Sequence, residues 1–459
     1  MDPDAYRAIV FNSARDGNIR RLRVFLEDRS NTWIQDCLGP GEIGTPPLVI
    51  ASRNGHLDVV KSPDQFRELL EVEKGADVHI TGSVTFDGDL IPEVPALWAA
   101  AAAGHLDIVQ YLVEEGHADV NQTTGTHSTP LRGACYDGHF EIVKYLAEKG
   151  ANIELANQHG HTPLMIAAFR MRASVVQFLL ARGADPLRAS VRVSSVLKIF
   201  CEPVIVLSFS VLLLGNTALH DAAESGSKEI IIMLLDAGAK HVPDDGGVLP
   251  IYCAALAGHE AAMYTLANRA ASPQEARDAI KLYGATLVDK KMDIMGAVQA
   301  WLLAVTIGNP LPSRSATAAY ENMLEIDSEQ DVRNVADDPE AIRMQALIIR
   351  ERVVGPAHHE THYYIRYRGA VYCDLGDTNR CFKLWMHALA LQQKNLCALH
   401  PSTVGTIVTF VDTFLIGIND AIINVNEEDV WTPPITRGQV MPVLDKAIYE
   451  LERLCYNLS

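Results

Sequence analysis

Apolar and polar positions repeat along the first half of the chain at a spacing of about 33 residues. Each unit reads T-P-L-x-x-A-A-x-x-G-H, followed by apolar residues at i, i+3 and i+4 and then by L-L-x-x-G-A. Four clear copies cover residues 95–121, 129–155, 162–186 and 217–240. A partial copy covers residues 46–60, and two weaker copies cover residues 5–26 and 249–270. This spacing of apolar residues predicts two short helices in each unit.

The unit is that of an ankyrin repeat, and its residue types have physical reasons. Thr129 can cap a helix whose first turn tolerates Pro130. Small residues such as Ala134 let the inner helices of successive repeats stack closely, and Gly138 suits the tight turn between the two helices. The histidine after that glycine is expected to hydrogen-bond to local backbone rather than to a ligand. We therefore predict an all-α fold, with about seven ankyrin repeats over residues 1–271.

One repeat interval is too long. Thr162 and Thr217 are 55 residues apart, and the excess falls over residues 190–214, at a junction between repeats. The uninterrupted apolar run there, residues 204–214, is shorter than the roughly 20 residues that a membrane-spanning helix needs. Spanning would also separate repeats that must stack to be stable. We expect an insertion, either a retained intron or a natural loop, and a smaller insertion at residues 62–68.

The second half carries helical patterns of another kind. We expect a helical connector, an acidic loop, tetratricopeptide-like helices and a poorly patterned helical tail over residues 272–307, 308–340, 341–400 and 401–459. The run Y-R-G-A-V-Y-x-D-x-G, followed by C-x-K-L-W-x-x-A-L, resembles the tetratricopeptide helix pair. In such a pair a small residue, here Gly369 or Ala370, meets a bulky one, here Trp385.

Composition and motifs exclude several classes of function. A net charge of −18 argues against non-specific nucleic-acid binding, and no signal peptide or membrane partner is expected. Eight cysteines in no paired spacing indicate reduced thiols and a cytoplasmic, or also nuclear, location. No phosphate-binding loop, G-x-S-x-G, H-E-x-x-H or C-x-x-C occurs, so we expect no enzyme, catalytic residue or cofactor. His358, His359 and His362 are predicted to lie in a solvated loop, not to bind a metal.

Residues 79–98 form an extended finger before the third repeat, longer than the repeat needs, with Phe86, Asp87 and Asp89 near its tip. Tyr136 and Asp137 are expected to face the concave groove of the repeats. Carboxylates there suit a guanidinium, because charge-assisted hydrogen bonds contribute about 1.5–3 kcal/mol each. The alternative is that Asp87 only forms a turn and that Asp137 only ends a helix, and composition does not decide between the two.

Several motifs together resemble the feminization-one (Fem) family of ankyrin-repeat proteins. They are G-S-V-x-F-D-G, T-x-x-x-S-T-P-L-R-x-A-C-x-D-G-H, G-A-T-x-V-D-K-K, R-M-Q-A-L-x-I-R-E-R-x-x-G-P and Y-Y-I-R-Y-R-G-A-V-Y. The likeness runs from about residue 7 to residue 397, and it is closest to the subgroup that reads C-terminal arginine. It implies a substrate-recognition subunit of a cullin-2 RING ubiquitin ligase, which holds Arg-ended C-terminal degrons in the ankyrin groove and performs no bond chemistry itself.

The resemblance also implies a set of binding residues. Asp137 and Asp87 would hold the basic end of the degron, and Arg132 is a candidate for meeting its terminal carboxylate. The other motif positions that could line the same pocket are Phe86, Trp98, Ser128 and Tyr136. The implied partners are substrate proteins with basic C-terminal degrons, together with elongin B/C and cullin-2 in full-length relatives.

The chain departs from the family pattern at three places. Tyr136 stands where a Phe is usual, and Met171-Arg172 replaces the Gly-His of the fifth repeat, which we expect to strain that turn. The family's later ankyrin repeats and its elongin-binding helix, L-x-x-x-C-L-A-A-R, are not recognised here. We therefore expect a chain that is C-terminally incomplete, and a non-ligase ankyrin scaffold for protein–protein interaction is the alternative function.

Overall fold

The computed structural model describes residues 3–26, 44–61, 78–190, 215–309, 316–423 and 437–458. The described part is mainly helical, with one two-stranded sheet. Contacts divide the chain into two compact units, unit 1 (Met1–Asp245) and unit 2 (Gly246–Ser459). An ankyrin solenoid followed by a helical domain, as the sequence predicts, is confirmed. No helix in the described ranges is both long and apolar enough to cross a lipid bilayer.

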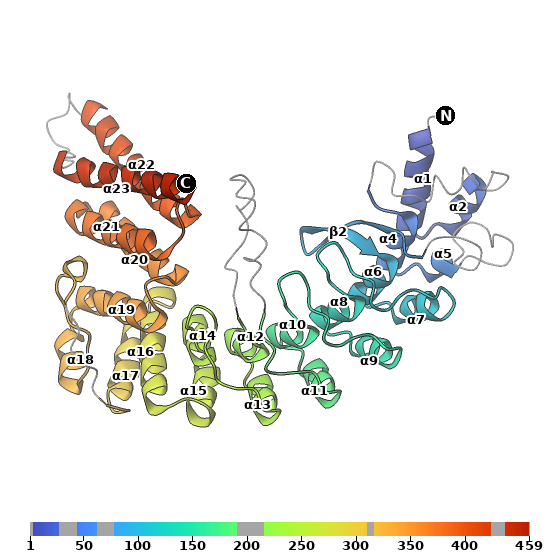
Figure 1. Ribbon diagram of the computed structural model, residues 1–459, viewed down its shortest axis with the longest axis horizontal. Helices are drawn as coiled ribbons and strands as arrows, with labels where there is room; N and C mark the ends of the chain where they lie inside the picture. Colours follow the sequence, from blue (N-terminus) through green and yellow to red (C-terminus); the bar gives the residue numbers. More distant parts are fainter. Residues whose placement is uncertain are drawn as a thin grey trace. The chain divides into compact units, whose positions relative to one another are not determined.

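Unit 1 is a row of short helix pairs (Figure 1). In chain order these helices are α1 (Pro3–Arg15), α2 (Ile19–Leu26), α4 (Pro47–Arg53), α5 (Leu57–Lys61), α6 (Ala96–Ala103), α7 (Leu106–Glu114), α8 (Pro130–Asp137), α9 (Phe140–Glu148), α10 (Pro163–Phe169), α11 (Ala173–Ala181), α12 (Ala218–Ser225) and α13 (Lys228–Asp236). The inner helices stack in the order α4, α6, α8, α10, α12, and the outer helices stack beside them. Fully buried small residues, Ala134 and Ala222 among them, permit this close approach.

The turn between the two helices of a pair is held by a histidine of the next pair. The imidazole of His139 hydrogen-bonds to the carbonyl of Ala102 at 3.1 Å, and His105 bonds in the same way to Arg53 at 3.0 Å. The two imidazoles bond to backbone carbonyls, as expected, but these carbonyls belong to the preceding repeat and are not local. A Cβ on Gly104 would lie 2.6 Å from the His139 ring, so any larger residue there would have to displace the imidazole.

The fifth repeat keeps this arrangement with other residues. Met171 takes the left-handed conformation of the missing glycine, at φ 57°, so the expected strain is confirmed. Arg172 takes the place of the histidine, because its Nε donates to the carbonyl of Tyr136 at 3.2 Å. A guanidinium therefore makes the bond between repeats that an imidazole makes elsewhere.

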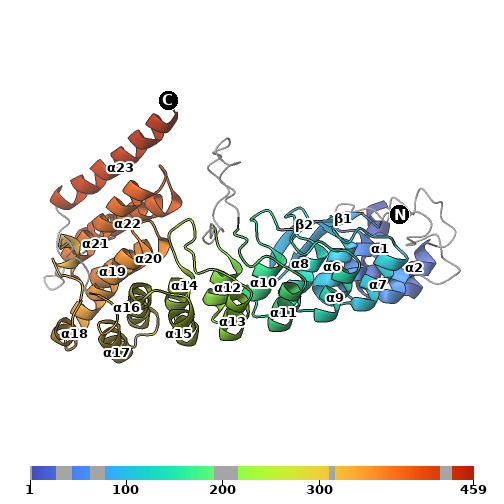
Figure 2. The same ribbon diagram turned by 60° about the horizontal axis from the view of Figure 1, so that its bottom comes forward.

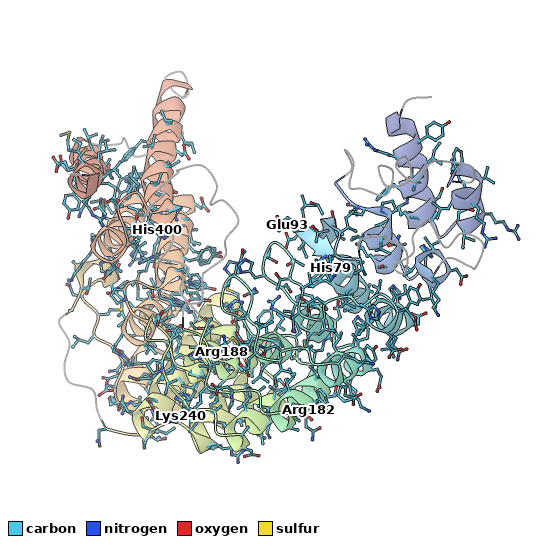
Figure 3. The ribbon with its side chains drawn as sticks, turned by 45° about the vertical axis from the view of Figure 1, so that its right-hand side comes forward. His79, Glu93, Arg182, Arg188, Lys240 and His400 are labelled. Atoms are coloured by element: carbon cyan, nitrogen blue, oxygen red, sulfur yellow. The ribbon has the colours of Figure 1, made fainter. Side chains whose placement is uncertain are left out.

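The finger before the third repeat is a β-hairpin. Strands β1 (Thr81–Phe86) and β2 (Asp89–Pro95) are antiparallel, with Phe86 opposite Asp89. Asp87 and Gly88 form the tip with φ of 50° and 91°, and Asp-Gly is a favoured pair for such a two-residue turn. The hairpin packs on α4 through β1 and on α6 through β2 (Figure 2). His79 and Glu93, labelled in Figure 3, lie towards its base.

The predicted insertions lie almost entirely outside the described residues, which omit 62–77 and 191–214. The residues that flank the longer one are described, and they meet. Ser190 donates its backbone N–H to the carbonyl of Asn216 at 2.8 Å, and α10 packs directly on α12. The fifth and sixth repeats therefore stack as neighbours do elsewhere in unit 1.

The helices of unit 2 range from 7 residues in α18 to 23 residues in α22. They are α14 (Pro250–Ala257), α15 (Glu260–Arg269), α16 (Pro273–Lys290), α17 (Ile294–Ala304), the 3-10 turn η3 (Ala318–Tyr320), α18 (Glu329–Val335), α19 (Pro339–Val354), α20 (His359–Asp374), α21 (Thr378–Asn395), α22 (Pro401–Ile423) and α23 (Arg437–Leu458). Contacts place α14 and α15 in this unit, and the predicted end of the repeats at residue 271 stays a prediction.

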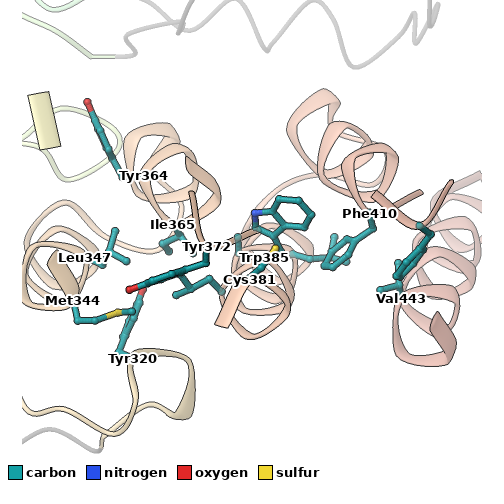
Figure 4. Packing of buried hydrophobic residues seen from close by; sticks show 14 residues of the cluster. Tyr320, Met344, Leu347, Tyr364, Ile365, Tyr372, Cys381, Trp385, Phe410 and Val443 are labelled. Carbon is teal, nitrogen blue, oxygen red and sulfur yellow. The ribbon is translucent and has the colours of Figure 1, made fainter. Parts of the chain in front are cut away.

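One hydrophobic cluster contains residues of η3 and of the helices α19, α20, α21, α22 and α23 (Figure 4). Its centre is Trp385, whose indole packs edge-on against Phe410 at 5.3 Å between ring centroids. Trp385 also donates a hydrogen bond to the carbonyl of Arg366 at 2.8 Å. A Cβ added at Gly369 would overlap the indole, so the expected meeting of a small residue with Trp385 is confirmed.

Candidate peptide-binding site

Tyr136 on α8 connects the helix to the tip of the hairpin. Its hydroxyl donates to Oδ2 of Asp87 at 3.1 Å. The ring of Phe86 meets Tyr136 edge-on at 6.4 Å and meets Trp98 edge-on at 5.8 Å, both between centroids. Burial and, after it, the hydrogen bond to Asp87 raise the pKa of Tyr136, so its phenol stays a hydrogen-bond donor. The hairpin tip is thus fixed above α8.

A buried layer supports these residues. Trp98 and Ser128 are 5% and 3% exposed, and the indole N–H of Trp98 donates to Ser128 Oγ at 3.1 Å. Arg132 donates to the same oxygen from Nη1 at 3.3 Å. Trp98 and Ser128 therefore hold the surface residues in place, whereas Phe86, Asp87, Tyr136 and Asp137 remain accessible.

Asp137 is the last residue of α8, and it faces two arginines of the fifth repeat. Its Oδ1 lies 3.9 Å from Nη2 of Arg170 and 3.8 Å from Nη2 of Arg172. The guanidinium of Arg170 also lies over the ring of Tyr136, 4.1 Å from its centroid. The aromatic ring and the carboxylate thus already hold one guanidinium from within the chain.

The charge of Arg132 is disfavoured by burial. Burial lowers the pKa of Arg132 to about 10, and its Nε has no hydrogen-bond partner in the described structure. Asp221 on α12, 8% exposed, acts on Arg132 through its charge, and burial raises the pKa of the Asp221 carboxyl. A guanidinium held by one long bond to Ser128 has donors left for an anionic group.

The structure therefore brings together all seven residues singled out from the sequence. The contacts run from Asp87 through Tyr136, Phe86, Trp98 and Ser128 to Arg132, and Asp137 follows Tyr136 directly. Sequence reasoning missed Arg170 and Asp221. The signal for Arg170 was available, because it stands 33 residues after Asp137, at the same position of the next repeat.

His358, His359 and His362 lie at the start of helix α20 and not in a loop, so that prediction is wrong, although His359 is exposed. Nδ1 of His358 accepts the N–H of Glu360 and caps α20, and His362 is 3% exposed inside the helix. Nε2 of His362 lies 2.7 Å from the carbonyl of Pro356. Burial lowers the pKa of His358 to about 3. Within the described residues no group of three or more His, Cys, Asp or Glu side chains could hold a metal.

Comparison with known proteins places this site in context. Residues 97–190 match the model for ankyrin repeats in three copies, and residues 214–245 match the model for a single ankyrin repeat. The chain is 44% identical over 433 residues to the sex-determining protein fem-1 of Caenorhabditis elegans, which covers 91% of this chain and 61% of that protein. It is 37% identical over 508 residues to the human protein fem-1 homolog A, which covers 97% of this chain and 71% of the relative. It is 40% identical over 457 residues to the mouse protein fem-1 homolog C, covering 97% and 68%.

Proposed function

The chain belongs to the Fem-1 family of ankyrin-repeat proteins, and from this premise we propose that it is a receptor for basic C-terminal tails. The groove of unit 1 binds the Arg-ended C-terminus of a substrate protein. In this proposal the receptor performs no bond chemistry: it places the substrate beside a cullin-2 RING ubiquitin ligase.

One observation carries the binding half of the proposal. The end of α8 already holds a guanidinium, that of Arg170, between the ring of Tyr136 and the carboxylate of Asp137. An incoming arginine side chain finds the same two partners, with the carboxylate of Asp87 beside them on the hydroxyl of Tyr136. Planar stacking on the ring and pairing with carboxylates are the contacts that guanidinium groups favour.

The other end of the tail requires a positive group. Arg132, on the same helix α8, has an unpartnered Nε and donates from Nη1 to Ser128 Oγ. A terminal carboxylate there would satisfy a guanidinium whose charge burial now disfavours. Because both a side-chain cation and a main-chain carboxylate are recognised, the proposal restricts the ligand to a chain end, not to any basic segment.

The test is fluorescence polarisation with a labelled ten-residue peptide that ends in arginine. The Asp137→Ala variant should bind it about 10- to 100-fold more weakly, the range expected when charge-assisted hydrogen bonds of about 1.5–3 kcal/mol are lost. The matched control is Asp107→Ala, which removes a carboxylate exposed on the outer helix α7. A C-terminally amidated peptide should also bind weakly. Unchanged affinity for Asp137→Ala contradicts the proposal.

The ligase half of the proposal is supported by family membership alone. This chain spans 61% of the nematode relative and 71% of the human one, so the activity of the whole relatives is carried over as a proposal. Co-purification with elongin B/C separates the two candidate functions. A chain that binds the peptide but no elongin would act as a non-ligase scaffold, the second candidate.

A further inference from the structure

Unit 2 contains a groove between α21 and α23 that the proposed function does not use. Its volume is about 740 Å³, within the range of about 300–1,000 Å³ that ligand sites occupy. The apolar part of its lining comes from Met386 and Ala390 on α21 and from Pro442 and Tyr449 on α23. A flexible thioether and a tyrosine ring suit an apolar side chain of variable shape.

The groove is positively charged in a protein of net charge −18. Lys394 on α21 and Lys446 on α23 line it from opposite walls, and neither ammonium forms an ion pair with a described residue. Arg453 also lines it but is already paired with Glu450, Nη1 to Oε2 at 2.9 Å. Asp445 is the one carboxylate among the lining residues. The ammonium of Lys446 lies 6.0 Å from the centroid of the Tyr449 ring. The two lysines are therefore the lining cations that have no carboxylate partner among the described residues.

The two walls are tied to each other inside unit 2. The side-chain amide of Gln393 on α21 donates to the carbonyl of Lys446 at 2.7 Å and to Glu450 Oε2 at 3.2 Å. Glu450, 1% exposed, also accepts the N–H of Leu399 at 2.7 Å. These bonds fix α23 against α21, so the groove is present without a ligand.

We propose that this groove binds an acidic segment of a partner protein that carries an apolar side chain. Lys394 and Lys446 stand on opposite walls of the groove, on α21 and α23. Positive groups spread in this way meet successive carboxylates along a peptide better than they meet one compact anion such as a phosphate. The apolar side chain of the segment lies on Met386 and Tyr449.

This site is independent of the proposed tail receptor. It lies in unit 2, whereas the tail site lies in unit 1, and it selects the opposite charge. A partner held here would be a second protein, or a second region of one protein, recognised by acidic residues.

The test uses the full chain and a labelled library of twelve-residue peptides. Four positions are Asp or Glu and two are Leu or Phe, and a matched library has Asn or Gln at the four acidic positions. Fluorescence polarisation is read for the wild-type chain, for Lys394→Glu/Lys446→Glu, and for Lys383→Glu. Lys383 is exposed on the same helix α21 and does not line the groove, so its variant controls for added negative charge.

The proposal expects the acidic library to bind the wild-type chain and Lys383→Glu at least tenfold more tightly than the amide library. It expects the double variant to lose that preference with an unchanged circular dichroism spectrum. Met386→Trp, which fills the groove without changing charge, should weaken binding as well. Equal binding of the two libraries to the wild-type chain overturns the proposal. Retained preference in the double variant, or full competition by stoichiometric inositol hexakisphosphate, overturns it too, the latter in favour of a compact anion.

Discussion

Arg170 is expected to compete with an arginine-ended ligand for Asp137 and for the face of Tyr136. Replacing it by Gln should therefore strengthen peptide binding. At the observed 3.9 Å, two unit charges interact by about 1 kcal/mol in water and by about 4 kcal/mol at an effective dielectric constant of 20. The side chains of Arg170 and Asp137 are 34% and 30% exposed, so the value lies near the aqueous end. Measured surface pairs contribute about 0.2–1 kcal/mol. We expect Arg170→Gln to tighten binding about two- to fivefold.

The assay is a fluorescence polarisation titration with the arginine-ended peptide at low and at physiological salt. The gain should shrink as salt is added, because the pair is partly exposed. Arg182→Gln is the matched control, since Arg182 makes a pair of similar length, 3.8 Å, with Glu148 outside the groove. Weaker binding by Arg170→Gln would refute the reasoning, because Arg170 would then hold the peptide rather than compete with it.

Three further predictions concern stability. Met171→Gly should stabilise unit 1 by about 0.5–1 kcal/mol in urea denaturation, since φ is 57°. Met295→Gly, in the first turn of α17, should instead destabilise unit 2, by up to about 1 kcal/mol. Gly369→Ala should lower the free energy of unfolding by about 1–3 kcal/mol, because the new methyl group overlaps Trp385. Gly405→Ala is the control: no neighbour lies nearer than 4.0 Å, so this change should be neutral or stabilising. Equal melting temperatures of the two variants would contradict this prediction. The pKa of His358 falls from 6.5 to about 3 on folding. The contribution of neutral His358 to the free energy of unfolding is therefore full above pH 6.5 and is lost as the pH falls towards 3. His358→Asn, which keeps the helix cap, should therefore lose less stability between pH 7 and pH 5 than the wild type does.

The repeats could be predicted from the sequence because their residue types follow from local requirements. A glycine at φ 80° after α8 and a threonine that caps it leave a clear pattern at Thr129 and Gly138. The tetratricopeptide-like contact of Gly369 with Trp385 was readable for the same reason, since one position needs a small residue where the other is large.

Contacts between repeats were harder to predict. Arg170 reaches Asp137 only because adjacent repeats stack in register, a relation that appears when residues 33 positions apart are compared. The bond of His139 to Ala102 was missed in the same way. His362 was placed in solvent because its burial depends on packing and on the carbonyl of Pro356, which the polar sequence around it does not indicate.

The central claim is that the carboxylates of the unit 1 groove bind the guanidinium of an arginine at a chain end. A double-mutant cycle tests it most directly, with Asp137→Asn in the protein and citrulline in place of the terminal arginine in the peptide. Citrulline keeps the shape of arginine and removes its charge. The account predicts a coupling energy of about 1 kcal/mol or more between the two changes. Additive effects, with a coupling energy near zero, would contradict it.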